Sequence, residues 1–273
     1  MESRSVGVDS IRMRWEEEGA GQPVIYLHGI PTSPRLWRHV IPRVQGARSL
    51  AWEMVGYGAS ILEAKGRDIS VARQAEYCSA WMQAIGVERA VLVGHDLGGG
   101  VAQILAVHHP DRVAGLVLIN SIAYDSWPIA SVKMMRAMGT LVERLPDALF
   151  RRVFSTFIHR GHDNRSRARE SAALHWSYYA AADGAAAFVR QIRALDAADT
   201  QAVADRLSQL TVPARLLWGT ADQFQKVGYG YRLAHDLAAP LERIEGGKHF
   251  VPEDHPERVA AAINELLAES EVR

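Results

Sequence analysis

Short apolar runs alternate along the chain with amphipathic stretches, and this alternation predicts the fold class. The runs are rich in Val, Ile and Leu, which is typical of strands buried on both faces of a parallel sheet. We expect such strands at Val24–Leu27, Ser49–Trp52, Val91–Val93, Val113–Ile119, Ala214–Gly219 and Leu241–Ile244. Helical spacing between them predicts helices at Pro34–Ile41, Ile69–Ile85, Val101–His108, Tyr231–Leu237 and Pro256–Leu267. Strands that alternate with helices predict an α/β protein with a mostly parallel, twisted sheet flanked by helices.

Two segments depart from this alternation. Val6–Trp15 alternates loosely between apolar and polar residues, which predicts an antiparallel pair at the edge of the sheet. From Tyr124 to Arg206 the pattern is helical throughout, without a strand-like run. We therefore predict a helical cap of residues 123–206, inserted into a core of residues 1–122 and 207–273. Such a cap would lie over the carboxyl ends of the strands, where open α/β sheets bind their ligands.

The composition narrows the class of partner. The chain has 273 residues, enough for one α/β domain with an insertion. Lys plus Arg and Asp plus Glu both number 31, so nothing indicates a nucleic acid or an anionic membrane as partner. The single cysteine, Cys78, excludes an internal disulfide framework and fits a reducing compartment. Because Met1–Ser5 is polar and no apolar run is long enough to span a bilayer, we expect a cytoplasmic protein that acts on a small molecule. The oligomeric state stays open.

The stretch Val91–Gly100 predicts a sharp turn from a strand into a helix. In such a nucleophile elbow, the residues two before and two after the tip sit against each other. Gly94 and Gly98 occupy these two positions, and glycine has no Cβ to obstruct the contact. The tip is Asp96, so a carboxylate is presented at the start of a helix whose positive end favours its charge.

Four segments resemble the functional loops of α/β hydrolases. His28–Pro31 resembles the oxyanion loop, and Gly94–Gly99 resembles the elbow. Trp218–Asp222 resembles the segment with the triad acid, and Gly247–Pro256 resembles the loop with the catalytic histidine. The order nucleophile, acid, base is the one that this fold requires. The chain therefore resembles an α/β hydrolase over nearly its whole length, and an aspartate at the elbow resembles the branch of haloalkane dehalogenases and epoxide hydrolases.

The resemblance implies a triad of Asp96, His249 and Asp222. A carboxylate is already anionic at pH 7 and can displace a leaving group from a saturated carbon. The resulting ester on Asp96 would be hydrolysed by a water that His249, held by Asp222, deprotonates. The backbone N–H groups of Ile30 and Leu97 would stabilise the oxyanion of this second step. We expect the reaction to need no cofactor and no metal.

A second position for the acid follows the strand at Val113–Ile119, where one group of dehalogenases has a carboxylate. Here the position holds Asn120 and Ser121, which supply no charge. The nearest carboxylate, Asp125, is expected to cap the loop that leads into the cap. We therefore expect Asp222 to be the acid.

The groups that would receive a halide depart from the dehalogenase pattern. In that family one N–H donor is a Trp directly after the nucleophile, and in many members another is an Asn directly after His-Gly. This chain has Leu97 and Ile30 at these positions. Trp127 and Trp176 in the cap are alternative indole donors, although packing of the cap onto the core is the more common role for a buried aromatic residue at either position.

Epoxide hydrolases instead protonate the ring oxygen with cap tyrosines. Tyr124, Tyr178 and Tyr179 are the candidates, and only one of the neighbours Tyr178 and Tyr179 can face a pocket because they point about 100° apart on a helix. His28–Pro31 and the position of Asp222 also fit that family. The sequence therefore favours an epoxide slightly over an alkyl halide.

The expected pocket is apolar. Leu97–Val101 contains no arginine to hold a substrate carboxylate, so we expect an uncharged, hydrophobic small molecule rather than fluoroacetate. The alternative from another class is a ligand-binding or non-hydrolytic protein with this fold, in which Asp96 is not a nucleophile. The remaining residues expected to contact the substrate are His28, Pro31, His95 and Phe250.

Overall fold

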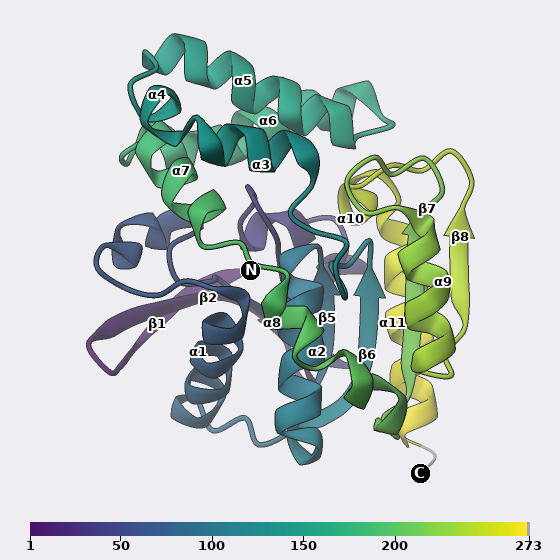
Figure 1. Cartoon of the computed structure of the whole chain (residues 1–273). Coiled ribbons are helices and arrows are strands. Elements are labelled where there is room, and N and C mark those ends of the chain that lie inside the picture. Colours follow the sequence, from purple (N-terminus) through teal and green to yellow (C-terminus); the bar gives the residue numbers. More distant parts are fainter. Residues whose placement is uncertain (272–273) are drawn as a thin grey trace.

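The computed structural model describes residues 1–271, which form a sheet with helices on both faces and a helical layer above it (Figure 1). The described strands are ordered β1-β2-β4-β3-β5-β6-β7-β8 in one eight-stranded sheet. β1 pairs with β2, and β2 with β4, in antiparallel fashion, and the remaining pairs are parallel. The strands are β1 (Glu2–Val8), β2 (Ile11–Gly19), β3 (Gln22–Leu27), β4 (Ala47–Trp52), β5 (Ala90–His95), β6 (Val113–Ile119), β7 (Ala214–Gly219) and β8 (Leu241–Ile244).

Helices cover the sheet and form the inserted layer. In Figure 1, α1 and α2 lie in front of the sheet and α11 lies behind it. The core helices are α1 (Val71–Ala84), α2 (Leu97–His108), α9 (Val227–Asp236), α10 (Val251–Asp254) and α11 (Pro256–Glu271). The insertion contains α3 (Ala130–Ala137), α4 (Gly139–Glu143), α5 (Asp147–Gly161), α6 (Arg165–Ala180), α7 (Ala185–Arg193) and α8 (Ala198–Gln201). Short 3₁₀ helices are η1 (Pro34–Trp37), η2 (Ile41–Arg43), η3 (Gly58–Ala64), η4 (Pro110–Arg112) and η5 (Ala204–Gln209).

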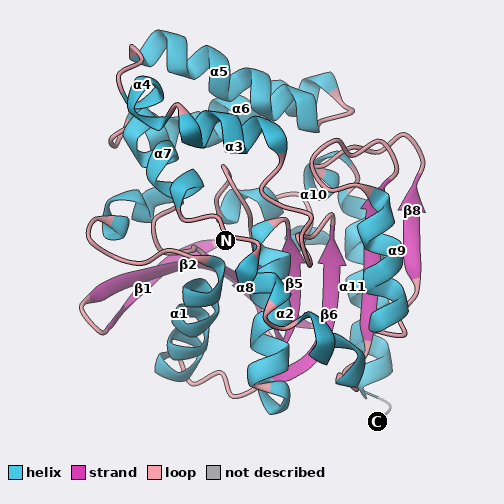
Figure 2. Ribbon diagram, viewed as in Figure 1, coloured by secondary structure: helices cyan, strands magenta, loops and turns pink. Residues whose placement is uncertain are grey.

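The predicted α/β architecture is confirmed, as is the helical character of the insertion. The strands expected at Val113–Ile119, Ala214–Gly219 and Leu241–Ile244 have the same bounds in the structure. The helices of the insertion lie beyond the carboxyl ends of the strands, toward which the arrows of β5 and β6 point (Figure 2). The residues that follow these strands therefore face the insertion.

The single helix expected at Pro34–Ile41 is wrong. The chain forms the separate 3₁₀ helices η1 and η2 there. Ser33 caps η1 by accepting a hydrogen bond from the Arg35 N–H, and Pro42 has no N–H with which to continue an α-helix. Within residues 1–271, each helix is too short or too polar to cross a membrane.

Candidate active site

Asp96 is the tip of the turn between β5 and α2, with backbone angles φ 53° and ψ −120°. A Cβ on Gly94 would lie 2.6 Å from the backbone oxygen of Gly98, so the two flanking residues pack backbone against backbone. A Cβ on Gly98 would overlap the backbone of Leu27 at the end of β3. The predicted elbow is confirmed, and its backbone strain coincides with the presentation of one carboxylate.

The carboxylate of Asp96 is held by backbone N–H donors. Its Oδ1 accepts a hydrogen bond from the Ile30 N–H at 3.1 Å, and the Leu97 N–H also bonds to the carboxylate. A Cβ on Gly29 would overlap this carboxylate, so the residue before Ile30 must be glycine. Burial raises the pKa of Asp96, whereas His249 and the two N–H groups oppose that rise. The structure thus brings together Asp96 and both residues predicted for the oxyanion hole.

His249 lies between two carboxylates. Its Nδ1 is 2.9 Å from Asp222 Oδ2, and its Nε2 is 3.5 Å from Asp96 Oδ2. Burial alone would lower the pKa of His249, but Asp222 and Asp96 outweigh it and raise the pKa above its usual value. The ring of Phe224 packs edge-on against the imidazole, with centroids 5.0 Å apart, and keeps it from turning.

Asp222 is oriented by two further donors. Its Oδ1 accepts a hydrogen bond from the Phe224 N–H at 2.7 Å, and its Oδ2 accepts one from the Asn120 side chain at 2.6 Å. From the sequence alone, Asn120 is only the place of an alternative acid. The parallel register of β6 and β7 places it instead beside the acid, where its amide supports the carboxylate.

Comparison with known proteins places this geometry in a family. A model of the α/β hydrolase fold matches residues 22–256. The chain belongs to the α/β-hydrolase fold family. Haloalkane dehalogenase 2 of Mycobacterium tuberculosis is 31% identical to this α/β hydrolase, over 97% of this chain and 94% of its own.

Solved structures agree on the fold. An α/β hydrolase fold protein from Burkholderia ambifaria has a TM-score of 0.87 at 23% identity, over 96% of this chain and 97% of that one. The epoxide hydrolase CorEH has a TM-score of 0.78 at 21% identity, over 98% of this chain and 99% of that one. The solved structures show the fold alone, whereas the family model and the sequence relative identify a hydrolase similar to haloalkane dehalogenases.

A narrow cavity of about 30 Å³ lies above Asp96, between the core of this α/β hydrolase and its inserted helices. Trp127 lines it, but its indole N–H donates to Thr200 Oγ1 at 2.8 Å. Pro31 lines a neighbouring cavity of about 170 Å³, and Phe157 borders both. The polar side chains in the wall of the first cavity are Asp96, His249, Trp127 and Gln225, and the rest of the wall is apolar.

His28 and His95 do not line this cavity among the described residues, because each is bonded to the backbone of a neighbouring loop. His28 Nε2 accepts a hydrogen bond from the Met54 N–H at 3.2 Å. Burial lowers the pKa of His28 to about 3, so the ring is neutral. His95 Nε2 donates to the backbone oxygen of His249 at 2.9 Å. Both histidines thus support the loops of the site and lie outside the described wall of the cavity.

The cap tyrosines also point elsewhere. The Tyr179 hydroxyl donates to Gln191 Oε1 at 2.6 Å inside the insertion. Tyr124 donates to Asp236 Oδ2 at 2.6 Å, and Tyr178 lines a separate cavity beside β2. Within the described part of the chain, none of the three is in the wall above Asp96. The packing of α6 against its neighbours, which sequence spacing does not determine, turns the hydroxyls of Tyr178 and Tyr179 away, and the bond to Asp236 in α9 does so for Tyr124.

Two further aromatic candidates are structural in this arrangement. Trp176 packs against Phe150 and Phe154, with ring centroids 5.8 and 5.7 Å apart. Phe250 stacks on His162 with centroids 4.7 Å apart, at the junction of α5 with the loop that carries His249. Neither ring lies in the described wall of the cavity, because each fills space between helices.

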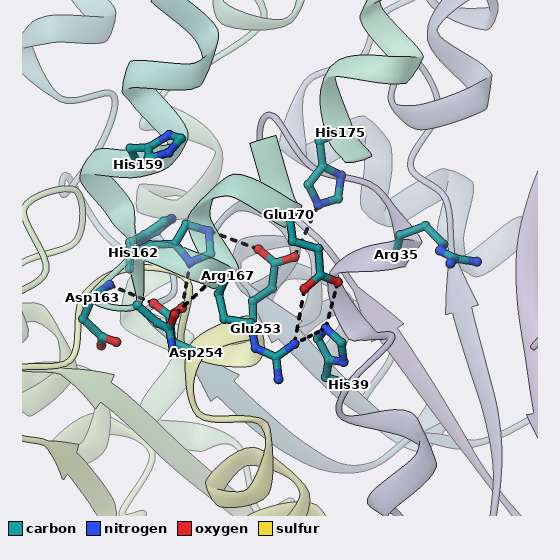
Figure 3. Close-up of polar contacts among 12 residues, drawn as sticks. Arg35, His39, His159, His162, Asp163, Arg167, Glu170, His175, Glu253 and Asp254 are labelled. Carbon is teal, nitrogen blue, oxygen red and sulfur yellow. Dashed lines mark hydrogen bonds and ion pairs between the residues drawn. The ribbon is translucent and has the colours of Figure 1, made fainter. Parts of the chain in front are cut away.

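A buried ionic network joins the inserted helices to α10 (Figure 3). Glu253 is fully buried and forms an ion pair with Arg38, which follows η1. From the insertion, His162 Nε2 and His175 Nε2 approach the Glu253 carboxylate at 3.2 and 3.7 Å. His162 Nδ1 also lies 2.8 Å from Asp254 Oδ1. Four segments that are distant in sequence therefore meet around one carboxylate.

The charges in this network stabilise one another. Burial alone would lower the pKa of His162, but Asp254 and Glu253 outweigh it and raise the pKa to about 9. Burial alone would raise the pKa of Glu253, but His162, His175 and Arg38 hold it well below its usual range. His162 is thus protonated and Glu253 ionised at neutral pH.

Replacing Glu253 by Gln should destabilise the protein by about 3–5 kcal/mol at pH 6, because Arg38 and His162 lose a shared counter-ion in a buried site. The loss should shrink toward pH 9. With its folded pKa raised to about 9, His162 contributes fully below its unfolded value of 6.5 and progressively less as pH rises through 9. Urea unfolding at both pH values measures the effect, with Glu257→Gln at an exposed position as control. Equal losses at the two pH values would contradict this charge assignment.

Proposed function

We propose that this α/β hydrolase is a haloalkane dehalogenase that removes a halide from a small, uncharged, hydrophobic molecule. The observation that carries the proposal is the composition of the cavity wall. Among the described residues in that wall, only Asp96 and His249 have titratable side chains, and both belong to the proposed triad. An epoxide oxygen needs an acid to protonate it as the ring opens, whereas a halide departs as a stable anion. The wall therefore suits a halide better than an epoxide.

The relatives support the same preference. The dehalogenase of Mycobacterium tuberculosis is 31% identical to this chain, whereas the likeness to the epoxide hydrolase, at 21% identity, concerns the fold alone. The slight preference for an epoxide rested on the cap tyrosines, on His28–Pro31 and on the position of Asp222. The hydroxyls of Tyr124, Tyr178 and Tyr179 lie outside the described wall of the cavity. We therefore replace the epoxide by an alkyl halide as the proposed substrate.

In the proposed mechanism, the two oxygens of Asp96 have different tasks. Oδ2 forms a bond to the substrate carbon as the carbon–halogen bond breaks, and the halide leaves with the electron pair. His249 Nε2 then takes a proton from a water, and the water oxygen attacks Asp96 Cγ. Negative charge develops on Oδ1, where the Ile30 N–H already stands at 3.1 Å. Collapse of this intermediate releases the alcohol, whose oxygen takes the proton from His249. The second proton of the attacking water then leaves Asp96 for solvent, which restores the carboxylate.

The experiment that tests the proposal compares two substrates of similar size. The purified protein is incubated with 1-bromobutane and with 1,2-epoxybutane, and bromide and diol are measured. We expect bromide release with the first and little diol from the second. Diol without bromide would overturn the proposal in favour of an epoxide hydrolase. Binding of either compound without turnover would favour the non-hydrolytic alternative, in which Asp96 is not a nucleophile.

The pH profile of turnover should show an acid limb. His249 must be neutral to accept a proton from water, and Asp222, which stays charged while Asp96 is esterified, raises its pKa, although burial alone would lower it. Below that pKa we expect kcat to fall about tenfold per pH unit. Halide release at saturating 1-bromobutane between pH 5 and pH 9 measures the limb. A kcat that is unchanged down to pH 5 would contradict the role of His249 as a base.

A further inference from the structure

The departing halide needs a hydrogen-bond donor in the cavity. The positions that bear such donors in typical dehalogenases hold the apolar side chains of Leu97 and Ile30, and their backbone N–H groups bond to the Asp96 carboxylate. The indole N–H of Trp127 is engaged by Thr200 at 2.8 Å. These groups are therefore already committed before a substrate binds.

Gln225 is the remaining polar side chain in the wall of this cavity. It is 3% exposed, and its Oε1 is buried without a hydrogen-bond partner among residues 1–271. Its side-chain nitrogen likewise forms none of the hydrogen bonds found in the described part of the chain. The N–H groups of the carboxamide thus have no hydrogen-bond partner among the described residues, and an acceptor in the cavity would supply one.

The backbone of Gln225 is fixed relative to the proposed triad. Its carbonyl oxygen accepts a hydrogen bond from the indole N–H of Trp218 in β7 at 2.8 Å. The preceding Phe224 donates its N–H to Asp222 and packs on His249. The backbone that carries the carboxamide is therefore held in the loop of the acid, and its side chain lies in the wall of the cavity that contains the nucleophile.

We propose that Gln225 receives the leaving halide through its side-chain N–H. The inference rests on the proposed function. As Asp96 Oδ2 bonds to carbon, the carbon–halogen bond breaks and its electron pair stays on the halogen. The halide then accepts a hydrogen bond from the carboxamide, and no proton is transferred. Because an amide N–H donates but does not titrate near neutral pH, this donor serves a halide and not an alkoxide.

The role proposed for Gln225 predicts that the effect of removing its N–H on the rate of ester formation depends on the leaving group. Charge is most concentrated on the smallest halide, so loss of the donor should matter more for chloride than for iodide. Gln225→Met keeps the length of the side chain but has no N–H. We expect it to slow ester formation from 1-chlorobutane about 10- to 100-fold, which corresponds to one hydrogen bond to a charged group. Ester formation from 1-iodobutane should slow less than about threefold.

The measurement is single-turnover ester formation, followed by intact mass in proteins that also carry His249→Gln, so that the ester accumulates. Gln225→Asn retains the N–H on a shorter side chain and should recover part of the chloride rate. Gln223→Met is the matched control, because Gln223 lies in the same loop but is exposed and bonded to Arg160. It should leave both rates unchanged.

The outcomes separate the two proposals. Equal slowing with chloride and iodide, or no slowing with either, would overturn the role of Gln225 while the ester itself still supports dehalogenation. If the parent protein with His249→Gln forms no adduct with any alkyl halide, the proposed function fails, and the inference fails with it.

Discussion

Asp96→Asn should abolish turnover of alkyl halides, with kcat reduced by about 10⁴- to 10⁶-fold. A neutral carboxamide is a poor nucleophile toward saturated carbon, so the first step of the proposed mechanism stops. The substitution keeps the shape of the side chain, and the retained oxygen can still accept a hydrogen bond from the Ile30 N–H. The loss should therefore come without loss of the fold.

Halide release and the unfolding temperature of the variant test this prediction together. Asp125→Asn makes the same chemical change at an exposed position near the cap and should retain activity. Full halide release by Asp96→Asn would show that Asp96 is not the nucleophile, and the proposed mechanism would be abandoned.

His249→Gln should leave the first step working and block the second. We expect one equivalent of bromide per protein with 1-bromobutane and then a steady rate about 10²- to 10⁴-fold below that of the unchanged protein. The ester would remain because no base at this position activates water. The protein mass should rise by a butyl group less one hydrogen, and peptide mapping should place it on Asp96.

His255→Gln is a suitable control, because His255 pairs with Asp163 outside the cavity and should show normal turnover. Two results would contradict the prediction. Continuous turnover by His249→Gln would mean that another group activates the water, and an adduct on any residue other than Asp96 would assign the nucleophile elsewhere.

Most of the core of this protein is predictable because its signals are local. A run such as Val113–Ile119 is apolar throughout, and only a strand covered on both faces buries all of it. The elbow is predictable because Gly94 and Gly98 meet a steric demand within five residues of chain, which the structure shows as backbone contact. The segments with Asp222 and His249 follow strands of the same sheet, so parallel packing brings them to the same edge.

The residues that line the cavity, unlike those of the core, are not predictable from local sequence patterns. Whether Tyr179 faces the substrate depends on how α6 packs against its neighbours, and the structure turns its hydroxyl to Gln191. The network around Glu253 joins α5, α6, η1 and α10, whose members carry no shared pattern in the sequence. Gln225 is likewise a single glutamine in a loop, which by itself indicates nothing.

The amino-acid sequence thus determined the order of strands and helices, the carboxylate at the elbow and its expected partners in the triad, since each depends on residues close in the chain or on the alternation of the fold. The tertiary structure alone decided which side chains border the cavity. It removed the cap tyrosines from that wall and left Gln225 there with an unsatisfied amide. The physical reason is that hydroxyls and amides find their partners only after distant segments have packed together.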